Sequence, residues 1–286
     1  MPKDKGSLGI ERGTGSFAGP GNISLFEHWW RPEDGSRAAV VLVHGLKDHG
    51  GRYDHVGEWL ARRGYAVYAP DLRGHGKAEG RRFFVDSFDE YVEDLGVFVQ
   101  RVRAREPGKP MYVLGHSMGG EVASLFVLDR RADLQGLVLS APALEPAGDV
   151  SRAMIWLSGV VSILFPRAPV TKIDVKALSH LPEVIQAARN DPLCGDRPAP
   201  ARTGYQILVS MRRIRERARE ITLPILILHG TDDQVTNPRG SERLFELAGS
   251  EDKQLKLYDG LYHEILNEPE QERVLEDIVG WLDGRC

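Results

Sequence analysis

Short apolar runs and longer stretches with helical spacing alternate along most of the chain. Continuous apolar runs occupy residues 38–43, 65–69, 111–114, 136–140 and 225–228. Runs of this length are typical of strands that are buried on both faces of a sheet. Between them, apolar residues recur at helical spacing, as in residues 53–63 and 88–105. The alternation predicts an α/β fold with a mostly parallel central sheet flanked by helices.

The two ends of the chain complete this pattern. The first forty residues are predicted to form strands, most clearly residues 23–30, where apolar and polar residues alternate. Near the C-terminus, a helix is predicted over residues 240–248, a strand over residues 254–258 and a last helix over residues 270–282.

The alternation is interrupted after Pro142. Residues 143–223 contain no apolar run of the buried-strand type and are predicted to form helices and loops. An insertion at this point would lie over the carboxyl ends of the strands, where open α/β sheets bind ligands. We therefore predict a core of residues 1–142 and 224–286, and an inserted helical cap, or lid, of residues 143–223.

The run Gly-His-Ser-Met-Gly at residues 115–119 fits the G-x-S-x-G pattern of a nucleophile elbow. It follows the predicted strand 111–114 and begins a predicted helix, which is the context that the elbow requires. A sharp turn of this kind leaves no room for side chains beside the nucleophile, so Gly115 and Gly119 have a steric role. Ser117 is therefore the predicted nucleophile.

A serine nucleophile needs a base, and in elbow-type hydrolases the base follows the serine and the acid in the chain. Three histidines follow Ser117. His180 lies in the insertion, and His229 ends a strand, where it could be structural. His263 lies in the loop after the last predicted strand, which makes it the predicted base.

The acid should lie in the loop after residue 228. Asp232 and Asp233 both fit by position, the spacing does not separate them, and Asp259 is a weaker alternative. The oxyanion hole needs two backbone N–H groups. One is expected from Met118, which follows the nucleophile, and the other from Leu46, in the glycine-rich loop after the strand 38–43.

Composition excludes several classes of protein. The chain has 286 residues, a formal net charge of -4 and 42% hydrophobic residues, as in an ordinary globular protein. No nucleic-acid partner is expected, because the run of five arginines between residues 212 and 219 is interrupted by Glu216 and followed by Glu220, and it is interpreted as a solvated helix face. Two cysteines, Cys194 and Cys286, predict neither a disulfide framework nor a zinc site. Residues 1–7 contain no apolar leader, which predicts a cytoplasmic protein.

Five motifs in the same order resemble those of the monoacylglycerol lipases, in the serine hydrolase group called Hydrolase_4 or lysophospholipase-like. They are His44-Gly45-x-x-Asp48-His49-x-x-Arg52-Tyr53, Asp71-x-Arg73-Gly74-His75-Gly76, Gly115-His116-Ser117-Met118-Gly119-Gly120, His229-Gly230-Thr231-Asp232-Asp233 and Tyr262-His263-Glu264. The similarity extends from about Gly9 to Leu282. It implies an α/β-hydrolase fold and a triad of Ser117, Asp233 and His263, with Asp233 chosen because the family's acid is the third residue after the glycine of that motif.

The resemblance also implies a reaction. A protein of this family cleaves the ester bond of a monoacylglycerol to a free fatty acid and glycerol through an acyl-enzyme, with no metal and no organic cofactor. Two departures concern substrate choice: Asp48 stands where the family usually has Glu, and Ala78 where it usually has Ser. A general carboxylesterase or a lysophospholipase with the same triad remains an alternative, as does a non-catalytic binding protein on the same fold.

An apolar segment in the insertion bears on the substrate. Ser151 is a predicted N-cap for a helix that Pro166 ends, and most of the residues between them are apolar. One interpretation is a helix buried against the core. The other is that Trp156, Leu157, Val160 and Leu164 bind the acyl chain of a lipid ester while the outer face makes weak peripheral contact with a membrane or micelle. The oligomeric state is not predicted.

Overall fold

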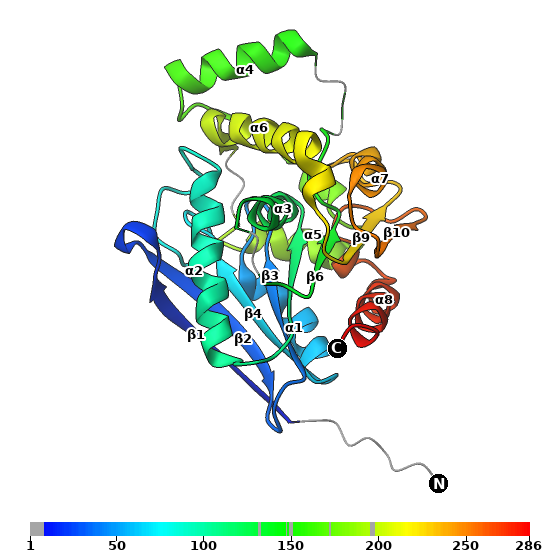
Figure 1. Cartoon of the computed structure of the whole chain (residues 1–286). Coiled ribbons are helices and arrows are strands. Elements are labelled where there is room, and N and C mark those ends of the chain that lie inside the picture. The colour runs from blue at the N-terminus through cyan, green and yellow to red at the C-terminus, as the bar shows by residue number, and fades with distance from the viewer. Residues whose placement is uncertain (1–8, 131–132, 147, 149–150, 172, 195–197) are drawn as a thin grey trace.

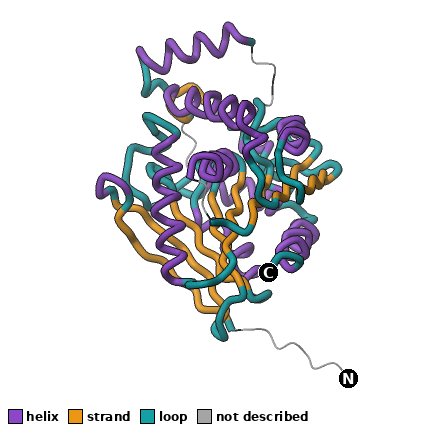
Figure 2. The backbone as a smooth tube through the Cα atoms, in the orientation of Figure 1, coloured by secondary structure: helices purple, strands orange, loops and turns teal. Residues whose placement is uncertain are grey.

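The computed structural model describes residues 9–286 except 131–132, 147, 149–150, 172 and 195–197. Its centre is an eight-stranded sheet with the order β1-β2-β4-β3-β5-β6-β9-β10 (Figures 1 and 2). The strands are β1 Ile10–Ala18, β2 Ser24–Pro32, β3 Ala38–Val43, β4 Tyr65–Asp71, β5 Met111–His116, β6 Gly136–Ser140, β9 Ile225–Gly230 and β10 Lys253–Tyr258. β1–β2 and β2–β4 pair antiparallel and the other neighbours pair parallel. The predicted mostly parallel α/β fold is confirmed.

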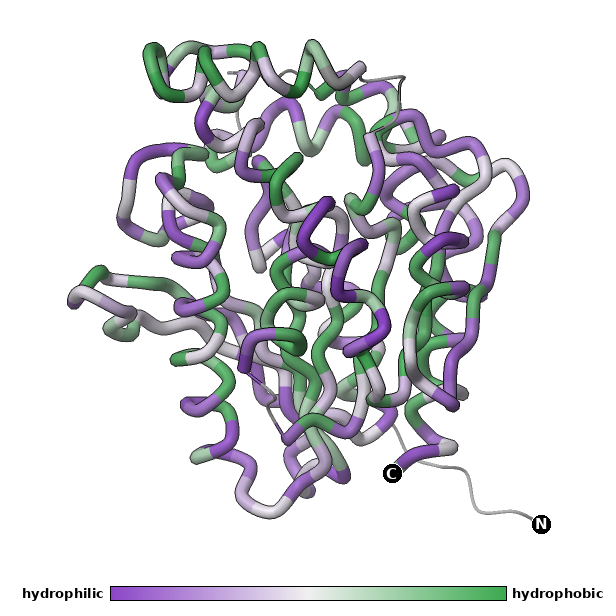
Figure 3. The backbone as a smooth tube through the Cα atoms, turned by 45° about the horizontal axis from the view of Figure 1, so that its top comes forward, coloured by the Kyte–Doolittle hydropathy of each residue, from purple (hydrophilic) through white to green (hydrophobic). Residues whose placement is uncertain are grey.

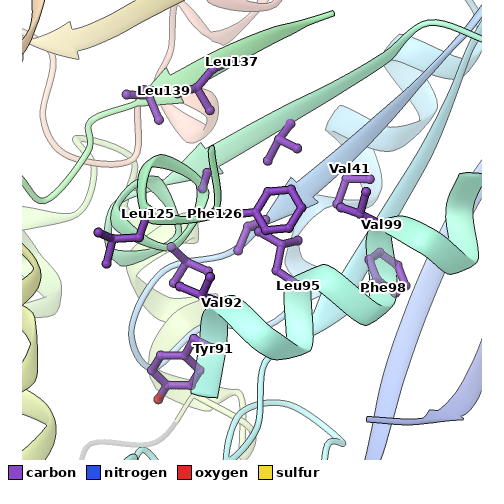
Figure 4. Packing of buried hydrophobic residues seen from close by; sticks show 14 of the residues in the cluster. Val41, Tyr91, Val92, Leu95, Phe98, Val99, Leu125, Phe126, Leu137 and Leu139 are labelled. Carbon is purple, nitrogen blue, oxygen red and sulfur yellow. The ribbon is translucent and has the colours of Figure 1, made fainter. Parts of the chain in front are cut away.

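Helices cover both faces of this sheet. The core helices are α1 Asp54–Ala61, α2 Asp89–Arg105, α3 Met118–Arg130, α7 Pro238–Leu247 and α8 Gln271–Asp283, with 3₁₀ turns η1 Pro20–Asn22, η2 Gly50–Tyr53 and η5 Ile265–Asn267. On one face, Phe98 of α2 and Phe126 of α3 pack with Leu139 of β6 (Figure 4). On the other face, Leu60 of α1 packs in one cluster with Trp281 of α8. Each large apolar side chain buried in this way contributes about 1.5–3 kcal/mol, which holds the carboxyl ends of the strands in fixed positions.

The N-terminal residues form a hairpin of β1 and β2, which pair along their whole lengths. Strands were expected in this region, but the apolar alternation located only the second of them. β1 is an edge strand, and Phe17 is the one buried residue among its nine. Because an edge strand with little buried surface needs few apolar residues, its sequence carries almost no pattern.

The segment between β6 and β9 forms a separate layer over the carboxyl ends of the strands (Figure 1). It contains α4 Arg152–Leu164, β7 Pro169–Thr171, the 3₁₀ turn η3 Val175–Ala177, α5 Pro182–Asn190, β8 Ala199–Pro200, α6 Ala201–Arg217 and the 3₁₀ turn η4 Ala218–Glu220. β7 and β8 form a small antiparallel pair that the sequence did not indicate. Two or three residues are too short for a periodic pattern, so this pairing comes from tertiary contact.

The apolar helix α4 lies at the outer edge of this layer, with α6 between it and the core (Figure 1). The predicted N-cap is confirmed, because the Ser151 hydroxyl accepts a hydrogen bond from the backbone N–H of Met154 at 3.2 Å. The alternative of a helix buried against the core is wrong, since the Trp156 side chain is 70% exposed. Green, hydrophobic residues on this outermost helix are visible in Figure 3.

Among the described residues, no helix combines the length and the apolar character that a membrane span requires. The N-terminal segment 1–8, which carries the expectation of no leader, lies outside the described residues.

Candidate active site

Ser117 occupies the tight turn between the last residue of β5 and the first residue of α3. Its φ angle is 54°, in the left-handed region that non-glycine residues seldom adopt. A Cβ atom at Gly119 would lie 2.2 Å from the carbonyl oxygen of Val43, and one at Gly115 would lie 2.4 Å from the carbonyl oxygen of Gly119. Backbone atoms cannot yield by that much, so both positions need glycine. The strained turn holds the Ser117 hydroxyl above the sheet.

Three buried side chains from three separate loops form one chain of hydrogen bonds. His263 Nε2 lies 2.9 Å from Ser117 Oγ, and His263 Nδ1 lies 2.7 Å from Asp233 Oδ2. An ionised carboxylate can only accept, so Nδ1–H donates to Asp233. Nε2 is then the nitrogen that can accept the hydroxyl proton of Ser117.

Electrostatics favour a charged His263 in this arrangement. Burial by itself lowers the pKa of His263, but the charge of Asp233 and its hydrogen bond outweigh burial and raise the pKa above its ordinary value. Burial likewise raises the pKa of Asp233, but the charge of His263 and hydrogen bonds from His229 and His263 hold that pKa well below its usual range. Asp233 therefore stays ionised at neutral pH and can stabilise an imidazolium beside it.

Asp233 is held by more groups than the sequence indicated. Its Oδ1 accepts from the backbone N–H groups of Val235 at 2.7 Å and Thr236 at 2.9 Å, and its Oδ2 accepts from the Thr236 hydroxyl at 2.8 Å. His229 Nε2 lies 3.0 Å from Oδ2, and His229 Nδ1 lies 2.7 Å from Ser241 Oγ. His229 is thus a partner of the acid. Asp followed after three residues by Thr is a common turn pattern, and that signal could have identified Thr236.

Other sequence candidates lie outside this chain of hydrogen bonds. Asp232 is exposed, and its carboxylate accepts from the Thr231 hydroxyl at 3.3 Å. Asp259 is also exposed. The Nδ1 of His180 lies 2.7 Å from a carboxylate oxygen of Glu268. Of the two aspartates that spacing left open, the one in contact with the histidine is Asp233.

The two predicted oxyanion donors come from two different segments next to the nucleophile. Met118 is the first residue of α3, where backbone N–H groups lack an intrahelical acceptor and lie at the positive end of the helix dipole. Leu46 follows β3 and borders the cavity at Ser117. A Cβ atom at the neighbouring Gly45 would lie 3.0 Å from the Ser117 Cβ. This loop therefore passes directly over the nucleophile, and its approach depends on a small residue.

An arginine connects the two loops that surround the nucleophile, a feature that the sequence analysis missed. Arg52 makes a bidentate pair with Glu264, at 3.0 and 2.9 Å, and also donates to Asp48 at 3.1 Å. Tyr53 donates its hydroxyl to Asp48 at 2.7 Å. Burial raises the pKa of Asp48, but the charge of Arg52, nearby histidines and the hydrogen bond from Tyr53 together hold that pKa well below its usual range. Glu264 directly follows the histidine of the site, so Arg52 fixes the position of that loop.

His44, His75 and His116 take no part in the hydrogen bonds that join Ser117, His263 and Asp233. His44 Nε2 accepts from the backbone N–H of Leu72 at 3.0 Å. Burial lowers the pKa of His75 to about 3 and that of His116 to about 3. Both are therefore neutral at physiological pH, which leaves His263 as the histidine of this site with a raised pKa.

Two clusters of potential metal ligands occur among the described residues, and both include His49. One adds His28 and Asp71, and the other adds Asp191 and Cys194. His49 Nε2 already lies 2.8 Å from Asp191 Oδ2, a hydrogen bond that satisfies both groups. Each cluster offers three ligand atoms, the number that a catalytic zinc site uses. Nothing in the chemistry of a serine triad requires an ion there, and the absence of a metal cofactor stays a prediction.

The cavity at Ser117 is small. Its volume is about 50 Å³, whereas pockets for small molecules commonly have about 300–1,000 Å³. The insertion contributes to its wall Ile173, Val175, Leu178, Ala188 and Cys194. The residues of the insertion that close the cavity lie between β7 and β8.

The four cap residues expected at the acyl site lie elsewhere. None of Trp156, Leu157, Val160 and Leu164 borders the cavity at Ser117. Leu157 lines a separate apolar pocket of about 420 Å³ between α4 and α6. Trp156 and Leu164 are exposed, and Val160 is half-buried. The reason is that α6 separates α4 from the core, an arrangement that helical periodicity could not reveal.

A strained serine between a parallel strand and a helix, with a histidine and an aspartate from later strand ends, defines a serine hydrolase of the α/β-hydrolase fold. Comparison with known proteins gives the particular family. The chain belongs to the Hydrolase_4 family, described as serine aminopeptidase S33, whose model matches residues 34–270. It is a carboxylic ester hydrolase of the serine type.

Several relatives are similar over nearly the whole chain. A monoacylglycerol lipase of Mycolicibacterium smegmatis is 37% identical over 95% of this chain and 97% of its own length. A monoglyceride lipase of Rattus norvegicus is 32% identical over 91% of this chain and 87% of its own. The crystal structure of the Paleococcus ferrophilus monoacylglycerol lipase superposes with a TM-score of 0.81 at 31% identity, covering 98% of this chain and 100% of that one.

Proposed function

We propose that this protein hydrolyses monoacylglycerols to a free fatty acid and glycerol. The observation that carries the proposal is the Ser117–His263–Asp233 chain of hydrogen bonds, at 2.9 and 2.7 Å, in a protein that is 37% identical to a monoacylglycerol lipase. The proposal also assigns residues 1–142 and 224–286 to a catalytic core and residues 143–223 to a cap. Substrates are lipid esters, and the reaction uses no cofactor.

The proposed first half of the reaction forms an acyl-enzyme. His263 Nε2 accepts the hydroxyl proton of Ser117 while the oxygen attacks the ester carbonyl carbon. Asp233 holds the imidazole in the required tautomer and stabilises the imidazolium. The negative charge on the carbonyl oxygen is stabilised by the backbone N–H groups of Leu46 and Met118, a contribution worth about 3 kcal/mol per donor in comparable sites. The C–O bond then breaks, and glycerol leaves with the proton from His263.

The second half releases the acid. A water molecule gives a proton to His263 and attacks the acyl carbon, and the second tetrahedral intermediate collapses to a fatty acid and free Ser117. The raised pKa of His263 matters in both halves, because the histidine must be neutral to accept the first proton and charged to return it.

A long acyl chain requires the cap to move. A cavity of about 50 Å³ has no room for such a chain, and Ile173, Val175 and Leu178 form the part of its wall that belongs to the insertion. We propose that this part of the cap shifts when substrate binds and that the acyl chain then reaches the apolar pocket of about 420 Å³ beside Leu157. Loop and lid movements of this kind are common steps in catalysis.

The outer face of the cap is proposed to make peripheral contact with membranes or micelles. Several large apolar side chains of α4 and the turn after it are more than half exposed, namely Met154, Trp156, Leu157, Ile163, Leu164 and Phe165. A group of this size seldom stays in water on a monomeric protein. Because α4 lies on the layer over the carboxyl ends of the strands (Figure 1), this contact would bring the lipid phase to the side of the sheet that carries the catalytic residues.

The deciding experiment compares initial rates on 1-monooleoylglycerol, 1,2-dioleoylglycerol, lysophosphatidylcholine and p-nitrophenyl butyrate, with the Ser117→Ala variant as the blank. A strong preference for the monoacylglycerol that disappears in the variant supports both the substrate and the nucleophile. Preference for lysophosphatidylcholine would assign a lysophospholipase instead. A protein that shows no serine-dependent activity on any of the four would contradict the proposal.

One observation favours a second candidate, a carboxylesterase for short acyl chains. The cavity of about 50 Å³ would accommodate a short acyl group with much less movement of the cap. Rapid hydrolysis of p-nitrophenyl butyrate, with little turnover of 1-monooleoylglycerol in micelles, would support this candidate and reject the lipase.

A further inference from the structure

A cleft lined by arginines lies beside the exposed helix α4, away from the catalytic residues. Its volume is about 370 Å³. Arg212 and Arg215 line it from α6, and Arg239 and Arg243 line it from α7. Glu145 is the one acidic residue among the described residues that line the cleft. The arginines of α6 do not form only a solvated helix face, as the sequence predicts, because Arg212 and Arg215 also border this concave surface.

The positions in the two helices explain why four arginines line one cleft. Arg212 and Arg215 are three residues apart on α6, and Arg239 and Arg243 are four apart on α7, so each pair shares one helix face. Arg243 pairs with Glu145 at 2.6 Å, and Arg212 lies 3.5 Å from a glutamate of its own helix. Within the described part of the chain, Arg215 and Arg239 have no carboxylate oxygen within salt-bridge distance. The cleft thus carries positive charge on a chain whose net charge is -4.

The chemistry of the cleft suits a phosphate group. A guanidinium presents a planar fork of donors that matches two phosphate oxygens, and neighbouring arginines that repel one another are stabilised when an anion lies between them. The same cleft has apolar walls, formed by Ile155 of α4 with Tyr205 and Leu208 of α6. A phospholipid presents a phosphate next to the upper part of an acyl chain. Arginines beside an apolar wall match this combination.

We propose that this cleft binds the phosphate headgroup of an anionic phospholipid when the outer face of α4 docks on a membrane. The inference rests on the proposed contact of the cap with lipid, and it adds that the contact selects negatively charged surfaces. A membrane is favoured over an acidic protein or a nucleic acid because Ile155 lines the cleft from α4, the helix that carries the exposed apolar side chains. Basic residues near an anionic membrane surface and an apolar helix face strengthen binding together.

The test measures flotation of the full chain with vesicles of phosphatidylcholine alone and with vesicles that also contain phosphatidylglycerol. The wild-type protein should bind the anionic vesicles more tightly, and high salt should reduce the difference. Arg212→Gln with Arg215→Gln should weaken binding to the anionic vesicles by roughly 30-fold, since each basic residue near such a surface contributes about 1 kcal/mol. Binding to neutral vesicles should not change. Glutamine is a good helix former, and circular dichroism with urea unfolding checks that the variant folds.

The matched control is Arg12→Gln with Arg62→Gln. Both arginines are exposed, both pair with Glu58, and they lie on the core at β1 and the end of α1, far from α4 (Figure 1). This variant loses the same charge and should keep the wild-type preference for anionic vesicles. An equal loss in both variants would mean that net charge, and not the cleft, causes the preference.

Two further results would overturn the proposal. One is equal binding of the wild-type protein to neutral and anionic vesicles. The other is calorimetric binding of inorganic phosphate that the cleft variant abolishes, without any preference for anionic vesicles, which would assign a site for soluble phosphates. This outcome is independent of the proposed reaction. A protein that prefers anionic vesicles but does not cleave 1-monooleoylglycerol would support the phosphate-binding cleft and reject the lipase function. A protein that cleaves 1-monooleoylglycerol without preferring anionic vesicles would support the lipase function and reject the cleft.

Discussion

Replacing Arg52 by methionine should destabilise the fold more than replacing Arg52 and Glu264 together. The guanidinium makes three hydrogen bonds of 2.9 to 3.1 Å to Glu264 and Asp48, and its side chain is only 14% exposed. Removing one member of a buried ion pair leaves a charge without its partner and typically costs about 3–5 kcal/mol. Glu264 keeps a hydrogen bond from the Asn267 amide at 2.9 Å, so the expected loss lies near the lower end, about 3 kcal/mol.

The double variant Arg52→Met with Glu264→Met removes both charges. Asp48 still accepts from the Tyr53 hydroxyl at 2.7 Å and from the backbone N–H of His49 at 2.8 Å. Since replacing a whole buried pair by apolar residues is often nearly neutral, we expect a loss of about 1 kcal/mol or less. Urea unfolding of the wild type, both single variants and the double variant gives the coupling energy. A double variant whose loss equals the sum of the two single losses would refute the reasoning.

Three other changes test the nucleophile, the acid and the cap. Ser117→Gly and Ser117→Ala should both abolish hydrolysis, and the glycine variant should be more stable by about 1 kcal/mol, because it relieves the strain of the positive φ angle; equal urea midpoints would argue against that strain. Asp233→Asn removes the carboxylate that raises the pKa of His263. The histidine must be neutral to act as a base, so activity falls as pH falls through its pKa. In the Asp233→Asn variant, the acid limb of the kcat/KM profile should therefore shift to lower pH, and kcat should fall by about 10⁴. If the acid limb stays in place, the group that titrates there is not His263. Trp156→Ser with Leu157→Ser should slow hydrolysis of 1-monooleoylglycerol but not of p-nitrophenyl butyrate, and equal losses on both would exclude a role of α4 in lipid binding.

The turn that holds the nucleophile could be predicted from the sequence because its steric requirements are local. The turn at Ser117 needs glycine at 115 and 119 for reasons that involve atoms only a few residues away or on the neighbouring strand, so the motif itself carries the information. The choice between Asp232 and Asp233 was different. Both follow the same strand, and only the direction of each side chain relative to His263, which is set by the turn around Thr236, distinguishes them.

Contacts between distant segments were beyond the reach of sequence patterns. Arg52 and Glu264 meet across 212 residues of chain, and no periodicity records such a pair. The position of α4 could not be predicted from the sequence for the same reason. Its apolar residues predict a helix with a large apolar surface, but whether that surface meets the core, solvent or lipid depends on α6, which lies between them.

The insertion leaves the sheet at the end of β6 and returns at β9, and these two strands are direct neighbours in it, with Leu137 opposite Ile225. The core therefore already holds the two junctions close together, and the length of chain between them adds little to the entropy of closing that loop. Such a layer can be lengthened, shortened or exchanged during evolution while the strands that carry the nucleophile, acid and base keep their register. Substrate range in this architecture can consequently diverge by replacement of one continuous stretch of the gene, without any new solution to the problem of folding the core.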